Sequence, residues 1–424
     1  VLGFMIYTVK QRMIDNLIVF MLIMSTGGLL FVFNRNLSYL IFFTILGFSF
    51  SFLGKKLKKI TVFSSILTSL LIVSLFLINY IFAFNEQTDN KYLYYLMVVS
   101  ASILTLLFFH NNRTKNIMIE RVYFVLKIIT FHSILNFIAF FIIGNRLSII
   151  TSMYHECETF LNIFFYTTER GIVTLFGVEI CRNQGLFWEP GVLQAFLNVF
   201  FFLEAFILKR NRLLLLVVSF AILSTYSTTG LALLLIQGIV YFRSESKNNK
   251  VLLPIIIVLS IPVYLTFSVN VEEKVQGEKE ASFQKRLFDL TQPFFIALEH
   301  PLTGIGLDLE QFQKMRSEFH FSSNSLQSLE KEVGIDSKAT GTDKGSSNSI
   351  MFLLAAMGFP TAFLFLYMFF KQQIITRKKW LIMLILTISV MSEPLLLRPF
   401  FFIFIISGFT HYFHRITSHK QQLA

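Results

Sequence analysis

The sequence predicts an all-α polytopic membrane protein with about twelve transmembrane helices and a large extracytoplasmic loop that carries short helices. Three observations predict this class. Apolar residues make up 54% of the chain, and phenylalanine alone occurs 52 times. Apolar runs of roughly 20 residues, the length that crosses a bilayer as a helix, recur along the whole chain. Basic residues gather in alternate connections between these runs, as they do in multi-pass membrane proteins.

The apolar runs are expected to be helices because lipid offers the backbone no hydrogen-bond partners. The alternation of apolar and polar residues that a transmembrane barrel requires is missing from them. The expected spans cover residues 14–33, 37–53, 60–84, 92–109, 122–143, 191–208, 213–226, 228–242, 251–270, 349–370, 380–392 and 398–413.

The charge of the connections predicts how the chain is oriented. One alternate set, which includes 55–59 and 209–212, holds about 21 basic residues, and the opposite set holds about three. The positive-inside rule then places both termini in the cytoplasm. This topology accounts for the net charge of +12, so nucleic acid is not expected as a partner. Residues 1–424 are expected to form a single membrane domain with two external loops, 144–190 and 271–348.

Both cysteines, Cys157 and Cys181, fall in the first external loop. A disulfide is permitted outside the cytoplasm, where it would close a loop of about 25 residues and stabilise the fold by roughly 3 kcal/mol. The alternative is two separate thiols whose backbones lie too far apart to bridge. The sequence leaves both possibilities open.

The end of this loop, Arg182-Asn-Gln-Gly-Leu-Phe-Trp-Glu-Pro-Gly191, carries a cluster of functional side chains directly before an apolar run. Glu189 precedes Pro190 and should be extended, and Pro190 suits the first turn of a helix. A strongly polar cluster at the start of a membrane helix is a candidate functional site. The alternative is an interfacial anchor, because tryptophan and arginine also settle among the headgroups without taking part in chemistry.

The runs 213–226 and 228–242 are short, and both of their flanks are basic, so they should form a hairpin that turns on the outer side. A helix of about 14 residues spans roughly 21 Å, which is less than a hydrocarbon core of about 30 Å. The turn at 224–230 would then lie below the outer surface, where polar backbone has to be buried in protein or line a wet cavity. The alternative is a tilted hairpin in a locally thinned bilayer.

The second external loop opens with the charged residues 272–280, which should face solvent. Pro293 is expected to begin an interfacial or packed helix. Gly304 and Gly306 suit a tight turn, since no strand precedes them and a dinucleotide site would need a third glycine. His300 is interpreted as a helix-end capping residue, with catalysis as the alternative.

The sequence contains no spacing typical of a metal site, a Walker loop or a GxSxG nucleophile. Its histidines are scattered, and its outer carboxylates form no DxD pair. Neither a metal ion nor another cofactor is expected.

Several blocks, in this order, resemble the O-antigen polymerase and ligase superfamily of bacterial membrane glycosyltransferases. They are the stretch Arg182 to Gly191, Ser-Thr-Thr-Gly at 227–230, Arg286 ahead of His-Pro-Leu-Thr-Gly-Ile-Gly at 300–306, and Ser-Asn-Ser at 347–349 running into a helix with Gly358. The spans and the large late loop fit as well, so the resemblance covers most of the chain. It implies a GT-C-like membrane glycosyltransferase of the bacterial inner membrane.

The resemblance implies a Wzy-type polysaccharide polymerase acting on the periplasmic face. The donor would be a glycan on undecaprenyl pyrophosphate, transferred as a block to the non-reducing end of another lipid-linked repeat unit. Ligases of the superfamily typically have a histidine directly before the asparagine of the last block. Here Ser347 precedes Asn348, which favours a polymerase. The implied partners are the lipid-linked oligosaccharide and membrane lipid, and a chain-length regulator is a further partner that the resemblance leaves open.

The expected site residues follow from the resemblance and from the chemistry. A pyrophosphate leaving group gains negative charge, and arginines stabilise it where no metal is bound. Arg182 and Arg286 are therefore expected to hold the pyrophosphate. Glu189 is expected either to accept the proton of the attacking hydroxyl or to orient Arg182 or the acceptor sugar. The second role arises because a helix N-terminus favours the charged carboxylate and weakens it as a base.

Trp188 and Asn348 are further candidates for binding substrate. Arg170, Arg398 and Glu393 are second-rank candidates, and the alternative for each is a surface or pairing charge.

Other functions stay open at this point. An O-antigen ligase would use lipid A core as its acceptor. A flippase or other transporter of lipid-linked oligosaccharide would need residues from both faces and usually has two related halves, and no convincing internal repeat occurs. A structural membrane scaffold would not explain arginines beside short helices.

Overall fold

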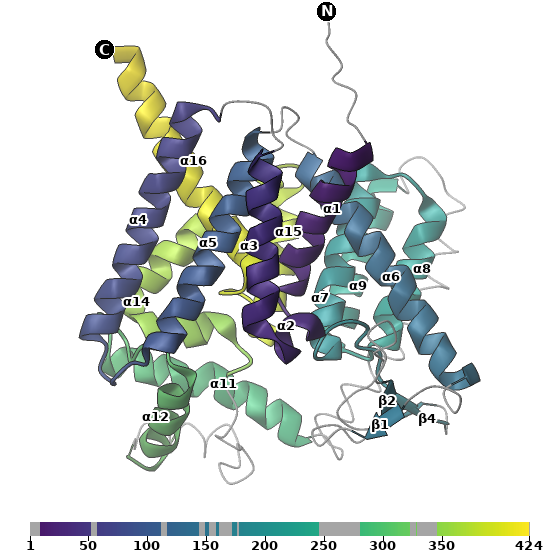
Figure 1. Ribbon diagram of the computed structural model, residues 1–424. Coiled ribbons are helices and arrows are strands. Elements are labelled where there is room, and N and C mark those ends of the chain that lie inside the picture. The colour runs from purple at the N-terminus through teal and green to yellow at the C-terminus, as the bar shows by residue number, and fades with distance from the viewer. Residues whose placement is uncertain are drawn as a thin grey trace, which may run out of the picture. The chain divides into compact units, whose positions relative to one another are not determined.

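The computed structural model describes residues 9–51, 57–111, 117–143, 149–151, 158–160, 172–175, 178–245, 280–322, 328 and 346–423. Regular structure in these residues is overwhelmingly helical (Figure 1), which confirms the predicted all-α class. The chain divides into two compact units. The first unit is Val1–Val62 with Ala101–Gly230, and the second is Phe63–Ser100 with Leu231–Ala424. Arg170, Cys157 and the apolar run 251–270 lie outside the described residues.

Five helices among the described residues are long and apolar enough to cross a membrane. They are Lys59–Phe82, Asp89–His110, Ile117–Ile142, Pro190–Leu208 and Ser349–Phe370. Shorter apolar helices cover Arg212–Ser224, Thr228–Ser244 and Lys379–Ser392. The chain is a multi-pass membrane protein by these criteria, and the count of about twelve spans stays a prediction.

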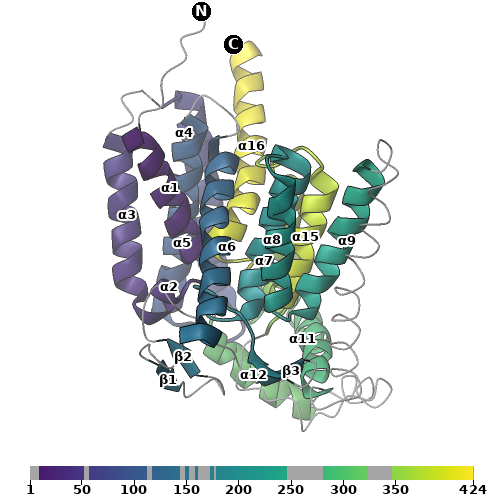
Figure 2. The ribbon, with the colours of Figure 1, turned by 90° about the vertical axis from the view of Figure 1, so that its right-hand side faces the viewer.

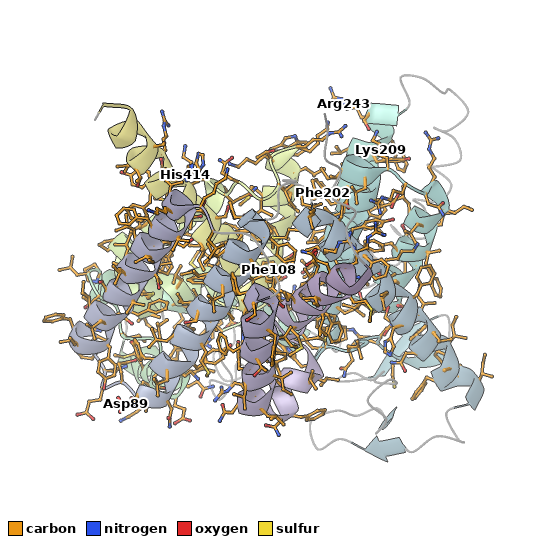
Figure 3. All side chains as sticks on the ribbon, turned by 45° about the horizontal axis from the view of Figure 1, so that its top comes forward. Asp89, Phe108, Phe202, Lys209, Arg243 and His414 are labelled. Carbon is orange, nitrogen blue, oxygen red and sulfur yellow. The ribbon has the colours of Figure 1, made fainter. Side chains whose placement is uncertain are left out.

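The first unit packs around one buried helix. Its helices are α1 (Val9–Met24), α2 (Leu29–Phe33), α3 (Arg35–Ser51), the second half of α5 (Asp89–Asn111), α6 (Ile117–Ile143), α7 (Pro190–Phe202), the π-helical continuation η2 (Leu203–Leu208) and α8 (Arg212–Ser224). Every residue of α7 is buried, and α7 contacts α6 and α8. Phe202, which is labelled in Figure 3, is fully buried, and Lys209, also labelled there, follows the last residue of η2. Lys209 adopts a left-handed conformation with φ 49°, which ends the helix there.

The apolar run 14–33 is two helices and not the single predicted span. Residues 25–28 separate α1 from α2. Ser25 and Thr26 donate their side-chain hydroxyls to the carbonyl of Leu22 at 2.8 and 3.0 Å, and Gly27 follows with φ 156°. Apolar length predicted one span, but polar and glycine residues break the helix locally.

Two small antiparallel hairpins interrupt the helices in the first predicted external loop. They pair β1 (Ile149–Thr151) with β2 (Glu158–Phe160), and β3 (Ile172–Leu175) with β4 (Val178–Cys181). The β1–β2 hairpin lies beyond the end of α6 in both ribbon views (Figures 1 and 2). Cys181 is disulfide-bonded. Its predicted partner, Cys157, lies outside the described residues.

The second unit places two polar helices at one end of a bundle. Its helices are most of α4 (Lys59–Phe82) and α9 (Thr228–Glu245), the first half of α5 (Asp89–Asn111), α11 (Glu280–Glu299), α12 (Leu309–Ser322), α14 (Ser349–Phe370), α15 (Lys379–Ser392) and α16 (Pro399–Leu423). Helix α14 contacts α11, α15 and α16. Helices α11 and α12 lie together at one end of α14 (Figure 1). Ile296, Ile305, Phe312 and Ala355 form a small core between them.

Pro293 lies inside α11 and does not begin it, contrary to the prediction. A proline inside a helix removes one backbone hydrogen bond. Phe288 and Ile296, one before and one after the proline, are each at most 1% exposed. Burial of apolar side chains along the same helix outweighs the loss of one hydrogen bond.

Helix α14 is broken at Gly358, whose φ of 71° and ψ of 168° are outside the helical range. The break frees the carbonyls of Ala355 and Ala356, which accept from the amides of Ile305 and Gly306 at 2.9 Å each. In return the carbonyl of Pro301 accepts from the amide of Phe359 at 2.8 Å. These contacts between residues 301–306 and 355–359 are called the α14 joint. They attach the end of the polar loop to a membrane-length helix.

Candidate functional site

Asn183 anchors the polar motif of the first unit. Its amide donates to the carbonyl of Ser224 at 2.9 Å, and its side-chain Nδ2 donates to Ser133 O at 3.1 Å and to Ser224 Oγ at 3.0 Å. Its Oδ1 accepts from the amide of Gly185 at 3.0 Å. Asn183 is fully buried, so the motif is fixed against helices α6 and α8.

Arg182 lies half-buried directly before this anchor. Its Nε donates to the carbonyl of Thr225 at 3.0 Å, in the turn that joins α8 to α9. A guanidinium held by a backbone acceptor has a defined direction before any ligand arrives. The two sequence blocks that the resemblance matched, at 182–191 and 227–230, therefore meet at one end of the first unit.

The rest of the motif is held by the break between α1 and α2. The amide of Trp188 donates to Gly27 O at 3.1 Å, and the amide of Leu29 donates to Leu186 O at 2.9 Å. A Cβ on Gly27 would lie 2.8 Å from the side chain of Val192 and 3.2 Å from the ring of Trp188. Only glycine permits this close approach, so Gly27 supports the site although the sequence did not mark it.

Glu189 has the local structure that its sequence predicts. Its backbone is extended, with φ −157° and ψ 158°, and Pro190 is the first residue of α7. Its backbone carbonyl accepts from the amide of Val192 at 3.2 Å, while its side chain makes no capping hydrogen bond. Glu189 is half-buried at the start of α7, and its carboxylate does not cap that helix.

The turn after α8 is buried by protein. Thr225 is fully buried, and Ser224 and Ser227 are at most 8% exposed. A Cβ on Gly230 would lie 2.9 Å from the side chain of Gln194, and Gly230 O accepts from Asn198 Nδ2 at 3.3 Å. This environment meets the requirement for polar backbone at membrane depth. The depth itself stays a prediction.

The second unit contains an ion pair that the sequence did not indicate. Asp289 and Arg316 are both fully buried, with Arg316 Nη2 2.8 Å from Asp289 Oδ1. The other oxygen, Oδ2, accepts from the amide of Ser347 at 2.9 Å and from its hydroxyl at 2.8 Å. Arg286, half-buried, lies one helical turn before Asp289 on α11. Burial lowers the pKa of Arg316, and the charge and hydrogen bond of Asp289 act in the opposite direction.

Asn348 caps helix α14, and Ser349 ties it to a second turn. Asn348 Oδ1 accepts from the amides of Ile350 and Met351 at 3.1 Å each. Ser349 Oγ donates to Glu393 O at 2.6 Å and accepts from the amide of Leu395 at 2.9 Å. The block at 347–349 thus joins α11, α14 and the turn after α15.

Arg398 lies half-buried at the end of that turn. Its Nη1 donates to the hydroxyl of Tyr94, and its guanidinium carbon lies 5.6 Å from the centre of that ring. A cation over an aromatic face is held in place without losing its charge. Pairing between Arg398 and Glu393 stays a prediction.

The loop after α11 is a tight turn, as its glycines predicted. Gly304 and Gly306 have φ of 68° and 97°. Asn79 Nδ2 donates to the carbonyl of Thr303 at 2.6 Å and to that of Ala356 at 2.8 Å, which holds the loop against α14. His300 stacks on Phe84 with ring centroids 4.1 Å apart, and burial lowers its pKa. His300 is therefore packed at a helix end.

Each unit separates polar motifs from basic connections. In the first unit, Arg182 and Glu189 lie at the start of α7, while Lys209 and Arg210 follow the other end of this 19-residue apolar segment. Such a segment spans roughly 28 Å, about the thickness of a bilayer core. In the second unit, α14 separates Asn348 from Lys371 in the same way. Which of the two ends faces the cytoplasm stays a prediction from the positive-inside rule.

Among the described residues, no group of three or more His, Cys, Asp or Glu side chains could hold a metal ion. The structure does not test the roles assigned to Arg182, Arg286, Arg398, Trp188 and Asn348. It shows what positions each of them inside its own unit, and those roles stay predictions. The sequence missed Asp289 and Arg316, although Asp289 lies on the same helical side as Arg286.

Comparison with known proteins finds one family. Residues 213–366 match the model of the family described as O-antigen ligase. This range runs from α8 to α14 and includes Gly230, Arg286, the α14 joint and Asn348. No curated protein and no solved structure matched the chain. The match supports the resemblance for the blocks that lie within it, and the block from Arg182 to Gly191 lies outside the matched range.

Proposed function

We propose that this chain, whose residues 213–366 match the family described as O-antigen ligase, is a polysaccharide polymerase of the O-antigen polymerase and ligase superfamily. The donor is a glycan on undecaprenyl pyrophosphate, and the acceptor is the non-reducing end of another lipid-linked repeat unit. The reaction takes place on the periplasmic face of the bacterial inner membrane, with both termini in the cytoplasm.

The observation that carries this proposal is the setting of Arg182. Its Nε is fixed on the carbonyl of Thr225, at the end of the first unit that lies away from the basic connection. Arginine is always charged and can bind two phosphate oxygens at once. A guanidinium with a fixed direction stabilises charge that develops on a leaving group without having to reorganise first.

Arg286 supplies the second guanidinium in this proposal. It lies half-buried, one turn before a carboxylate that is already occupied by Arg316 and Ser347. Both oxygens of Asp289 are thus engaged by those two partners. Arg398, Arg170, Trp188 and Asn348 are proposed to bind the sugars and the phosphate at the edges of the site.

In the reaction, the acceptor hydroxyl oxygen forms a bond to the anomeric carbon of the donor sugar. The bond from that carbon to the pyrophosphate oxygen breaks, and its electron pair leaves with undecaprenyl pyrophosphate. Arg182 and Arg286 stabilise the added negative charge. Glu189 accepts the proton that the acceptor hydroxyl loses. Side chains of the protein thus provide both the stabilisation of the leaving group and the acceptor for the proton.

Ser347 supports a polymerase over a ligase. It stands where ligases of the superfamily typically have histidine, and both of its donors are occupied by Asp289. The ligase alternative is tested by supplying lipid A core as the acceptor. A flippase, the alternative from another class, would move lipid-linked oligosaccharide across vesicles without lengthening it.

The test is a purified reaction with one synthetic lipid-linked repeat unit, no metal and no nucleotide, analysed on a gel. We expect a ladder from the wild type and none from Arg182→Ala or Arg286→Ala. Arg210→Ala is the matched control, because Arg210 is 50% exposed and follows the opposite end of the first unit. Normal ladders from both variants would contradict the proposal.

A further inference from the structure

The buried pair of Asp289 and Arg316 has a role beyond joining two helices. Both side chains have 0% exposure, so neither reaches a ligand. Arg316 is further enclosed by Gln292, which accepts from its Nε, and by the rings of Phe288 and Phe312 at 4.8 and 5.4 Å. Arg316 is therefore a fixed internal partner for the carboxylate.

A buried ion pair is a poor device for stability alone. The cost of removing two charges from water often equals or exceeds their attraction, and apolar residues of similar size commonly do as well. What a charge pair adds is direction, because each carboxylate oxygen accepts hydrogen bonds at defined angles. In Asp289 one oxygen is given to Arg316 and the other to Ser347.

The contacts continue from Ser347 toward Arg398, a second residue that is proposed to bind the substrate. Ser349, two residues on, accepts from the amides of Leu395 and Leu396 at 2.9 and 3.3 Å. The amide of Arg398 donates to Leu395 O at 2.9 Å. Hydrogen bonds and the short backbone segment 347–349 thus connect Asp289 on α11 to the backbone of Arg398.

We propose that Asp289 is a positioning residue. Its carboxylate holds the 347–349 turn against α11 and thereby fixes the position of Arg286 relative to Arg398. The inference rests on the proposed function, in which these arginines bind the substrate. Asp289 acts through them and does not touch the reacting atoms. A misplacement of about 1 Å between binding groups can cost on the order of 100-fold in rate.

The first measurement is hydrogen exchange, which requires no activity. The amides of Ser347, Ile350 and Met351 are protected by Asp289 and Asn348. In the double variant Asp289→Leu/Arg316→Met, which removes both charges together, we expect these amides to exchange at least about fivefold faster. The double variant is used because Asp289→Asn alone leaves the charge of Arg316 buried and unpaired.

The second measurement is turnover in the purified polymerisation reaction. We expect the double variant to lose about 100-fold in kcat with a smaller change in KM. Ser347→Ala, which lacks only the hydroxyl donor, should lose part of the turnover, and Ser347→Thr, which keeps the hydroxyl, should retain the wild-type rate. Glu120→Gln is the control. The carboxylate of Glu120 pairs with the guanidinium groups of Arg121 and Arg210 at 3.7 Å each, and all three residues belong to the first unit.

Unchanged exchange in the double variant would overturn the inference, and so would faster exchange with wild-type turnover. An equal loss of turnover in Ser347→Ala and Ser347→Thr also contradicts it, because the hydroxyl would then not be the group that matters. A wild-type protein that makes no ladder contradicts the proposed function, and the exchange result then decides alone whether Asp289 holds the turn.

Discussion

Gly358→Ala tests the α14 joint, which attaches the polar loop to a membrane-length helix. Gly358 has φ 71° and ψ 168°, a region that only glycine occupies without strain. A Cβ there would lie 2.4 Å from Leu302 O and 2.8 Å from Pro301 O. Both atoms belong to backbone, so neither can rotate away.

The expected loss of stability follows from these two effects. Backbone strain of this kind costs about 1–3 kcal/mol, and forcing an extra carbon into packed backbone costs about 1–3 kcal/mol more. Gly358→Ala should therefore reduce the free energy of unfolding by about 2–6 kcal/mol. The hydrogen bond from the amide of Phe359 to Pro301 O would be disturbed as well.

The assay is thermal or denaturant unfolding of the purified protein in detergent. Gly47→Ala is the matched control, because Gly47 lies inside α3 with no heavy atom within 4 Å of a built Cβ. That control should leave the protein unchanged or stabilise it by about 0.5–1 kcal/mol. Equal stability of the two variants would refute the argument that the joint depends on Gly358.

Three further predictions concern single side chains. Glu189→Gln should lower turnover by about 100-fold or more if the carboxylate is the general base, and a variant that keeps a tenth of wild-type turnover would assign Glu189 to orientation. Burial lowers the pKa of His300 below its ordinary 6.5, so the unfolded state binds its proton more readily. Stability from this group is complete above pH 6.5 and falls as the pH drops below it. In His300→Phe the melting temperature should therefore depend less on pH in this range. An unchanged slope of melting temperature against pH would exclude His300 as the cause of that dependence. Cys181 is disulfide-bonded, so Cys181→Ser should cost about 2–5 kcal/mol in unfolding, and an unchanged melting temperature would show that the bond adds no stability.

Local chemistry explains what the sequence predicted well. The extended Glu189 before Pro190 and the tight turn at Gly304 and Gly306 both follow from rules that act over a few residues. Long apolar runs likewise predicted most helices. The prediction of a single span at 14–33 was wrong, because it relied on apolar length and not on the polar and glycine residues at 25–28 that break the helix.

The supporting framework could not be predicted, because it depends on partners far apart in the chain. Asp289 meets Arg316 from 27 residues away and Ser347 from 58 residues away. Gly27 supports the motif because its carbonyl accepts a hydrogen bond from the amide of Trp188. No periodicity or spacing in a single sequence indicates such pairings, which arise from tertiary packing.

The most direct test of the account is the purified reaction in which Arg182 and Arg286 are replaced. With one lipid-linked repeat unit, no metal and no nucleotide, we expect the wild type and Arg210→Ala to produce a polymer ladder. Arg182→Ala and Arg286→Ala should insert normally and produce none. A full ladder from both alanine variants would contradict the claim that guanidinium groups carry the departing pyrophosphate's charge.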